Sequence, residues 1–273
     1  MTAPVKLAAF AAVLAVIFGA AALAGGAVGR IHDPAAAAKG EMDMAADPIR
    51  GLAVSENGLT LELARRSAHA AAAFGLRFRI VGADGRAVRA FDLEHTKRMH
   101  LILVRRDLSG FQHLHPTLRA DGTWTTPVTL PAAGTYRVFA DFSVDGRPTT
   151  LADDLQVDGD VRSRPLPAPA KTAETDGFRV RLVDGAVRAG EESPLTFEVT
   201  REGRPVPLQD YLGAKGHLVA LREGDLAFLH VHPDASSLRF DATFPNAGSY
   251  RLFLQFQVAG RVHTAAFTME VSR

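Results

Sequence analysis

Six of the ten histidines in this 273-residue chain belong to a motif that occurs twice. In each copy a histidine is followed thirteen and fifteen residues later by two more and then by proline, giving His100, His113 and His115, and again His217, His230 and His232. Neutral imidazole is the commonest protein ligand for zinc and copper. The chain has no cysteine, which excludes thiolate ligands, blue-copper sites and disulfides. The motif therefore predicts a site for a copper or zinc ion held by nitrogen.

A tight hairpin would bring the imidazoles of the second copy together. Two apolar runs, 218–221 and 226–231, flank the turn pair Gly224-Asp225, a pattern typical of two antiparallel strands. With a two-residue loop, His217 lies opposite His232 in the neighbouring strand. His230 then points to the same face, because side chains alternate along a strand.

The turn of the first copy is less clearly marked in the sequence. A two-residue loop at Asp107-Leu108 pairs His100 with His115, whereas a four-residue loop pairs Ile102 with His115. Both loops keep the same parity, so the three histidines of this copy share a face in either case. Only an odd-numbered loop or a β-bulge would separate them.

A structural interpretation stands beside the metal site. Histidines near strand ends often serve as hydrogen-bonded structural groups, and a His-Pro pair can fix a corner. A single H-x-H pattern favours that interpretation, while its recurrence with a third histidine in two otherwise diverged repeats favours a metal. The two interpretations lead to different functions.

Several other residues are candidates for a supporting role. His263 could add a fourth nitrogen in the second repeat, although a structural or exposed histidine is the favoured interpretation of this residue. Asp92 and Asp210 could accept hydrogen bonds that orient a ligand imidazole. Met42 and Met44 could form a loose metal-catching arm before the first repeat, but two methionines in a linker favour an incidental occurrence.

The elements that position these residues are predicted to be strands. From residue 58 onward, short apolar runs alternate with turn pairs at roughly ten-residue spacing, which is typical of β-sandwich domains of about 100 residues. The second half repeats the first, since Gly248-Ser-Tyr250 matches Gly134-Thr-Tyr136 and the apolar runs around them correspond. The sequence predicts an all-β fold of two tandem immunoglobulin-like β-sandwich domains after a single N-terminal transmembrane helix.

The predicted boundaries follow from composition. Residues 7–28 carry no charge and are long enough to span a bilayer. A cleaved signal with a site at Ala22-Leu23-Ala24 is the alternative, but the apolar run continues beyond it, which favours an anchor. The predicted parts are a membrane anchor or signal at 1–30, a flexible linker at 31–56, domain 1 at 57–158, a proline-rich linker at 159–175 and domain 2 at 176–273.

Composition excludes several classes of function. The formal net charge is only +1, so nucleic-acid binding has no electrostatic support. No serine or phosphate-loop motif of a catalytic or nucleotide-binding kind is present in the sequence, so we predict that the protein is not an enzyme.

A resemblance adds to these predictions. The segments MHLILVRRDLSGFQHLHP and YLGAKGHLVALREGDLAFLHVHP resemble those of membrane-anchored extracytoplasmic bacterial proteins, of actinobacterial type, with tandem immunoglobulin-like or cupredoxin-like domains. Some of these are similar to the YtkA-like group, which is associated with copper handling. The resemblance covers about residues 55–271 and implies export, a β-sandwich fold and a heavy-metal role for the six motif histidines. The expected Met/His-rich arm is reduced here to His32, Met42 and Met44, which weakens the copper-chaperone form of this implication.

The sequence thus leads to two hypotheses. The first is a single-pass plasma-membrane protein whose domains lie outside the cytoplasm and bind copper(II) or zinc at the duplicated hairpins, for buffering or transfer. The second is a cell-envelope interaction scaffold of two immunoglobulin-like modules, with structural histidines and an envelope protein as partner.

Overall fold

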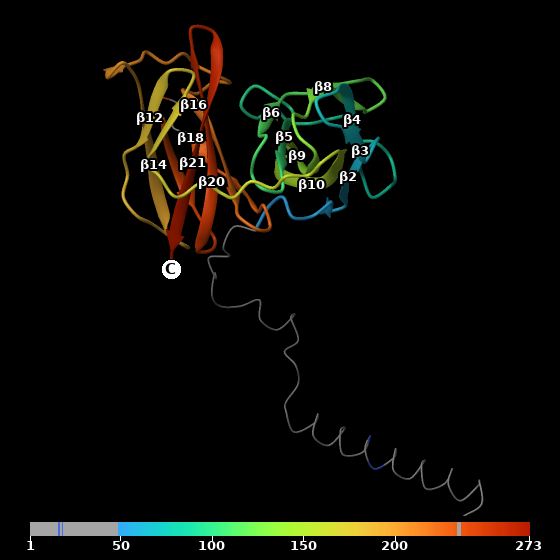
Figure 1. Cartoon of the computed structure of the whole chain (residues 1–273). Coiled ribbons are helices and arrows are strands. Elements are labelled where there is room, and N and C mark those ends of the chain that lie inside the picture. Colours follow the sequence, from blue (N-terminus) through green and yellow to red (C-terminus); the bar gives the residue numbers. More distant parts are fainter. Residues whose placement is uncertain (1–15, 17, 19–48, 234–235) are drawn as a thin grey trace, which may run out of the picture. The chain divides into compact units, whose positions relative to one another are not determined.

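The computed structural model describes residues 16, 18, 49–233 and 236–273, with only the backbone of His230, His232 and Pro233 (Figure 1). Apart from residues 16 and 18, the predicted anchor lies outside the described residues. The predicted metal-catching arm with Met42 and Met44 also lies outside them. Within the described part of the chain, no helix has the length and apolar character needed to cross a bilayer.

The first domain is a sandwich of two five-stranded sheets. One sheet has the order β1 (Ser55–Glu56), β2 (Leu59–Leu63), β4 (Ala73–Val81), β8 (Trp124–Thr129), β7 (Thr117–Leu118). The other has the order β3 (Ser67–His69), β10 (Arg147–Asp158), β9 (Gly134–Val144), β5 (His100–Arg105), β6 (Gln112–Leu114). All neighbouring strands are antiparallel except β3 and β10, which are parallel.

The second domain repeats this topology. Its first sheet has the order β11 (Thr172–Thr175), β12 (Phe178–Leu182), β14 (Glu192–Arg201), β19 (Arg239–Thr243), β18 (His232–Pro233), with β15 (Arg204–Pro205) also on β14. Its second sheet has the order β13 (Val187–Arg188), β21 (Arg261–Ser272), β20 (Gly248–Val258), β16 (Gly216–Arg222), β17 (Phe228–His230). The prediction of two tandem all-β, immunoglobulin-like sandwiches is confirmed, although β1 and β11 lie inside the two segments predicted as linkers.

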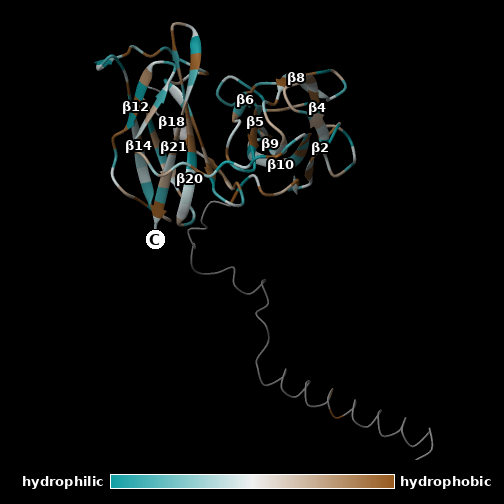
Figure 2. Ribbon diagram, in the orientation of Figure 1, coloured by the Kyte–Doolittle hydropathy of each residue, from teal (hydrophilic) through white to brown (hydrophobic). Residues whose placement is uncertain are grey.

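Each sandwich has its own apolar core, because side chains alternate between the two faces of a strand. Figure 2 shows hydrophobic and hydrophilic residues interspersed along the chain of both sandwiches. In the first domain Leu101 and Leu103 point inward and pack with Phe78, Trp124 and Tyr136. The second core is formed in the same way around buried phenylalanines of β14, β19, β20 and β21.

A third apolar cluster joins the two domains. It contains the outward-facing residues of β5 and β16, namely Ile102, Val104, Val219 and Leu221, together with Phe111, Phe139, Phe228 and Phe253. The rings of Phe111 and Phe253 stack with centroids 4.0 Å apart. Strand β5 is consequently buried on both faces along its whole length. This seam is where the first histidine of each motif lies.

Candidate metal centre

The first hairpin places its three histidines on one face, as the even register predicts. Strands β5 and β6 pair Leu101 with Leu114 and Ile102 with His113, the register in which His100 faces His115. The loop differs from both predicted forms. The amide of Leu108, a residue with φ of 62°, donates to the carbonyl of Arg105, whose own amide donates to Ser109. Arg105 and Ser109 enclose three residues, an odd number, and one extra residue between Ser109 and Gln112 restores the even register of the ladder.

The three imidazoles of this hairpin have the spacing of a metal site. His100 Nδ1 lies 3.1 Å from His113 Nε2, and one nitrogen from each ring lies within 4.8 Å of the others. The ring centroids are 5.3 Å apart for His100 and His113, 5.1 Å for His100 and His115, and 4.8 Å for His113 and His115. Tetrahedral coordination with bonds of about 2.0 Å places ligand nitrogens roughly 3.3 Å and ring centroids roughly 5 Å apart. The three centroid distances match the second value and the His100–His113 nitrogen pair matches the first, while the three candidate ligand atoms lie within 4.8 Å of one another.

Hydrogen bonds at the outer nitrogens fix which nitrogens can ligate. His100 Nε2 donates to the Glu94 carbonyl at 3.2 Å, and His113 Nδ1 donates to Gln255 Oε1 at 2.6 Å. The amide of Gln255 is oriented by its Nε2, which donates to Thr264 at 3.3 Å. A neutral imidazole carries only one N–H, so both inner nitrogens present lone pairs to each other. Two lone pairs 3.1 Å apart repel, and a cation between them removes that repulsion.

His115 and His113 are held neutral. Burial, followed by repulsion from His100 and Lys97, lowers the pKa of His115 to about 3. Burial, then the neighbouring His100 and His115, also holds the pKa of His113 well below its usual 6.5. His115 Nε2 is buried and has no hydrogen-bond partner among the described residues. Neutral imidazoles with accessible lone pairs are the form that binds transition metals.

The second hairpin has the predicted register but a different loop. Val219 pairs with His230, while the amide of Arg222 donates to the Ala227 carbonyl and Leu226, with φ of 61°, closes the turn. The loop therefore has four residues instead of the two predicted. His217 is buried at the start of β16, and its Nε2 donates to the Tyr211 carbonyl at 2.9 Å.

His232 corrects the predicted pairing. The ladder between β16 and β17 ends at His230, and the strand partner of His232 is Asp241, on the other sheet. Because Val231 is buried in the core of the second domain, the chain turns there and changes sheets. The prediction that His232 lies opposite His217 in the hairpin is therefore wrong. The side chains of His230 and His232 lie outside the described residues, so their role as ligands stays a prediction.

His217 lies with the histidines of the first domain. Its ring centroid is 6.5 Å from that of His100, 6.5 Å from that of His113 and 5.3 Å from that of His95. A cavity of about 40 Å³ at the seam is lined by His95, His100, His113, His217 and Asp141, among others. The described histidines of both motifs thus form one cluster between the domains, where the sequence predicted a separate site in each domain.

His263 does not contribute a fourth nitrogen. It pairs with Phe256 across β20 and β21, so it shares the inward face with that residue, while Gln255 faces the seam. Its Nδ1 donates to Asp176 at 2.7 Å, and its ring packs on Phe178. His263 is therefore a structural group on the core side of the sheet, in agreement with the structural interpretation that its position in the sequence favoured.

The residues that orient the ligands are not the predicted carboxylates. Asp92 accepts hydrogen bonds from Ser143 Oγ and the Gly146 amide, and Asp210 forms an ion pair with Lys215. Main-chain carbonyls orient His100 and His217 instead, which side-chain chemistry in the sequence does not reveal.

Two further residues of the site were missed. Asp141 and Gln255 occupy equivalent positions on β9 and β20, directly opposite His100 and His217. Both are buried. The signal available in the sequence was a polar residue immediately before Phe142 and Phe256, inside otherwise apolar strands.

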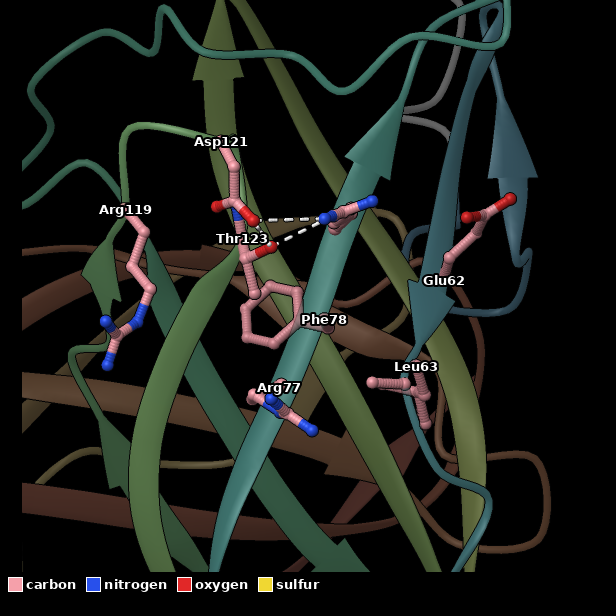
Figure 3. Close-up of a pocket in the computed structure, with 9 residues that line it drawn as sticks. Glu62, Leu63, Arg77, Phe78, Arg119, Asp121 and Thr123 are labelled. Atoms are coloured by element: carbon pink, nitrogen blue, oxygen red, sulfur yellow. Dashed lines mark hydrogen bonds and ion pairs between the residues drawn. The ribbon is translucent and has the colours of Figure 1, made fainter.

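A larger hollow of about 530 Å³ lies on the outer face of β2, β4 and β8 and is lined by charged residues (Figure 3). Arg79 donates from Nε to Thr123 at 2.9 Å and from Nη2 to Asp121 at 3.1 Å, and both partners lie on the turn that precedes β8. Arg77 and Arg119 flank this pair (Figure 3). The exposed ion pair between Arg79 and Asp121 forms part of this surface. No histidine among the described residues lines the hollow, unlike the cavity at the seam.

The fold resembles that of several bacterial proteins at low identity. They are trypsin-activated α2-macroglobulin of Escherichia coli (12% identity, TM-score 0.30, covering 82% of this chain and 16% of that one), the Escherichia coli adhesin FdeC (16%, 0.29, 81% and 66%) and the Yersinia pseudotuberculosis adhesin InvE (13%, 0.25, 78% and 58%). This chain thus spans less than two thirds of each of them. These likenesses concern the fold alone.

The family is identified by sequence. No protein of curated function matches the chain. A domain family matches it twice, at residues 53–159 and 173–273, in agreement with the repeated topology. The chain belongs to the family described as "Domain of unknown function (DUF8832)", two copies of which stand in tandem.

Proposed function

We propose that the protein binds a copper(II) or zinc ion through His100, His113 and His115, for buffering or transfer of the metal. The observation that carries this proposal is the 3.1 Å contact between His100 Nδ1 and His113 Nε2. The other ring nitrogen of each histidine donates a hydrogen bond to a protein oxygen. A structural histidine pair would share a proton across such a contact. The acceptors Glu94 O and Gln255 Oε1 instead hold the protons on the outer nitrogens, which leaves the inner ones for a metal.

The choice of metal follows from the ligands. Imidazole nitrogens suit zinc and copper(II), whereas magnesium and calcium prefer oxygen. Three imidazoles also leave a coordination position for a fourth ligand or for exchange. We infer a binding protein and not an enzyme, and we place it at the plasma membrane, anchored by residues 7–28 with both domains outside the cytoplasm.

Elemental analysis of the purified full-length chain tests the proposal. After loading with micromolar zinc or copper(II) and removal of excess metal, we expect about one ion per chain. The double variant His113→Ala/His115→Ala should lose that ion while keeping its far-UV circular dichroism. His69→Ala is the matched control, because the His69 side chain is 82% exposed and pairs with Asp158 at the surface, away from the motif histidines. A folded wild-type chain without bound metal would contradict the proposal.

The scaffold hypothesis is the second candidate, and the apolar seam supports it. The cluster around Phe111 and Phe253, with the hydrogen bond from His113 to Gln255, would hold two immunoglobulin-like modules in a fixed arrangement for an envelope partner. In that case the histidines are structural. The double variant would then lower the stability of the chain, and neither it nor the wild type would retain metal.

A further inference from the structure

We propose that the ion is shared between the two domains, with His217 supplying a fourth imidazole. Metal binding would then strengthen the contact between the domains at the seam. This inference rests on the function proposed above. It extends the three-histidine site of the first hairpin, which leaves one coordination position open, to a composite site that needs residues of both domains.

The two domains prepare equivalent ligands. His217 donates from Nε2 to the Tyr211 carbonyl in the way that His100 donates to the Glu94 carbonyl. Each carbonyl opens a tight turn whose two central residues have positive φ: 45° and 67° at His95 and Thr96, and 54° and 85° at Leu212 and Gly213. Both first histidines of the motif therefore keep Nδ1 as the nitrogen with a lone pair.

The distances place His217 within reach. Its ring centroid lies 6.5 Å from those of His100 and His113, compared with 4.8 to 5.3 Å within the trio. The difference is 1.2 to 1.7 Å, which a rotation of the imidazole about its side-chain bonds covers. Gly216 brings β16 close to β20, since a Cβ atom there would lie 2.7 Å from the Gln255 carbonyl oxygen.

The cavity and its charge fit a single ion. Its volume of about 40 Å³ is a few times the space that one water molecule needs. Asp141, only 7% exposed, lines it and accepts a hydrogen bond from Thr150 Oγ1 at 2.7 Å. A buried dication among neutral imidazoles is costly without a compensating charge, and this carboxylate supplies one.

A shared ion would make the contact between the two domains depend on metal. Phe111 of the first domain already stacks on Phe253 of the second, but that apolar contact has no dependence on metal. An ion held by His100 and His217 would add a link that forms and breaks with metal supply. The arrangement of the two domains would then report whether the site is loaded.

Two measurements on the full-length chain test this inference. The first is the zinc affinity of the wild type, His217→Ala and His217→Gln by competition with a chromophoric chelator. The glutamine variant retains a donor for the Tyr211 carbonyl but removes the ligating nitrogen, so it serves if the alanine variant fails to fold. We expect at least about tenfold weaker binding for each folded variant, with His69→Ala unchanged.

The second measurement is the distance between spin labels at Arg86→Cys and Arg204→Cys, one exposed site in each domain of a chain without native cysteine. Zinc should narrow the distance distribution in the wild type and leave it unchanged in His217→Gln.

The outcomes separate the two proposals. Wild-type affinity in both His217 variants, with binding lost in His100→Ala, would overturn the shared site and leave the first-domain site intact. Affinity unaffected by His100→Ala as well would overturn both. A tenfold loss together with the narrowed distribution would support the composite site.

Discussion

His113 lies between two neighbours with opposite requirements. Gln255 Oε1 accepts a hydrogen bond from His113 Nδ1, which must therefore carry the proton. His100 Nδ1 directs a lone pair at His113 Nε2. The neutral ring satisfies the first and leaves the second as a repulsive contact, so the residue is arranged for a cation and not for a hydrogen-bonded pair. Changing the acceptor therefore tests the function of the tautomer without touching a ligand.

Gln255→Leu should weaken zinc binding about tenfold. Without the acceptor, His113 can move its proton to Nε2 and donate to His100, a form in which the pair no longer needs metal. Competition titration measures the change, and Gln156→Leu, on the exposed side of β10, is the matched control. Unchanged affinity would show that Gln255 does not set the tautomer.

The neutral state of His115 predicts a pH dependence for the metal-free chain. Its folded pKa of about 3 is below the unfolded value near 6.5, so the unfolded state binds more protons between these limits. The stability from this residue is complete above pH 6.5 and is lost as the pH falls toward 3. Urea denaturation at several pH values should show a slope in this window that becomes smaller in His115→Gln. An equal slope in both proteins would contradict the assignment.

At the scale of the element, parity was predictable and loop geometry was not. The spacing of the first motif placed His100, His113 and His115 on one face, which holds because the ladder between β5 and β6 keeps the register in which His100 faces His115. The loops depend on Leu108 and Leu226, which adopt positive φ against their usual preference, so the turn pairs pointed to the wrong loop lengths. His232 pairs with a strand of the other sheet because Val231 packs in the core of the second domain, and the local sequence does not predict this packing.

The loop of the first hairpin is stabilised by a buried ion pair. Asp107 pairs with Arg105, and their side chains are only 9% and 5% exposed. Asp107 also accepts hydrogen bonds from Ser109 and from the amide of Arg164 in the linker between the domains. Removing the carboxylate leaves Arg105 buried without its counter-charge.

Asp107→Ala should lower the free energy of unfolding by about 3 to 5 kcal/mol. Asp121→Ala is the control, because Asp121 forms an exposed pair with Arg79 and its loss should cost at most about 1 kcal/mol. Denaturant midpoints with unchanged slopes measure both values. Equal losses in the two variants would show that burial does not make the Asp107 pair more important.

At the scale of the whole molecule, the sequence predicted two sandwiches but not their contact. The apolar runs of β5 and β16 have no polar alternation, a pattern typical of strands covered on both faces. The sequence of either repeat alone does not predict which surface covers the second face of these strands. The meeting of His100 with His217 follows from that contact, so separate sites were predicted where the described histidines of the two motifs lie in one cluster.

The seam can be weakened without touching a histidine. Phe253 is 4% exposed and stacks on Phe111 across the two domains. Phe253→Ala should destabilise the chain by about 3 to 5 kcal/mol and should lower zinc affinity if the site is composite. Limited proteolysis of the segment between the domains, at 159–171, checks the opening directly. Faster cleavage with wild-type affinity would show that metal binding does not need the seam.

X-ray absorption at the zinc edge of the loaded full-length chain tests the metal site most directly. We predict one ion per chain, coordinated mainly by nitrogen at about 2.0 Å with the multiple-scattering pattern of at least three imidazoles. The pattern should be absent in His100→Ala. A folded wild-type chain that retains no zinc, or whose zinc is coordinated only by oxygen, would contradict the assignment.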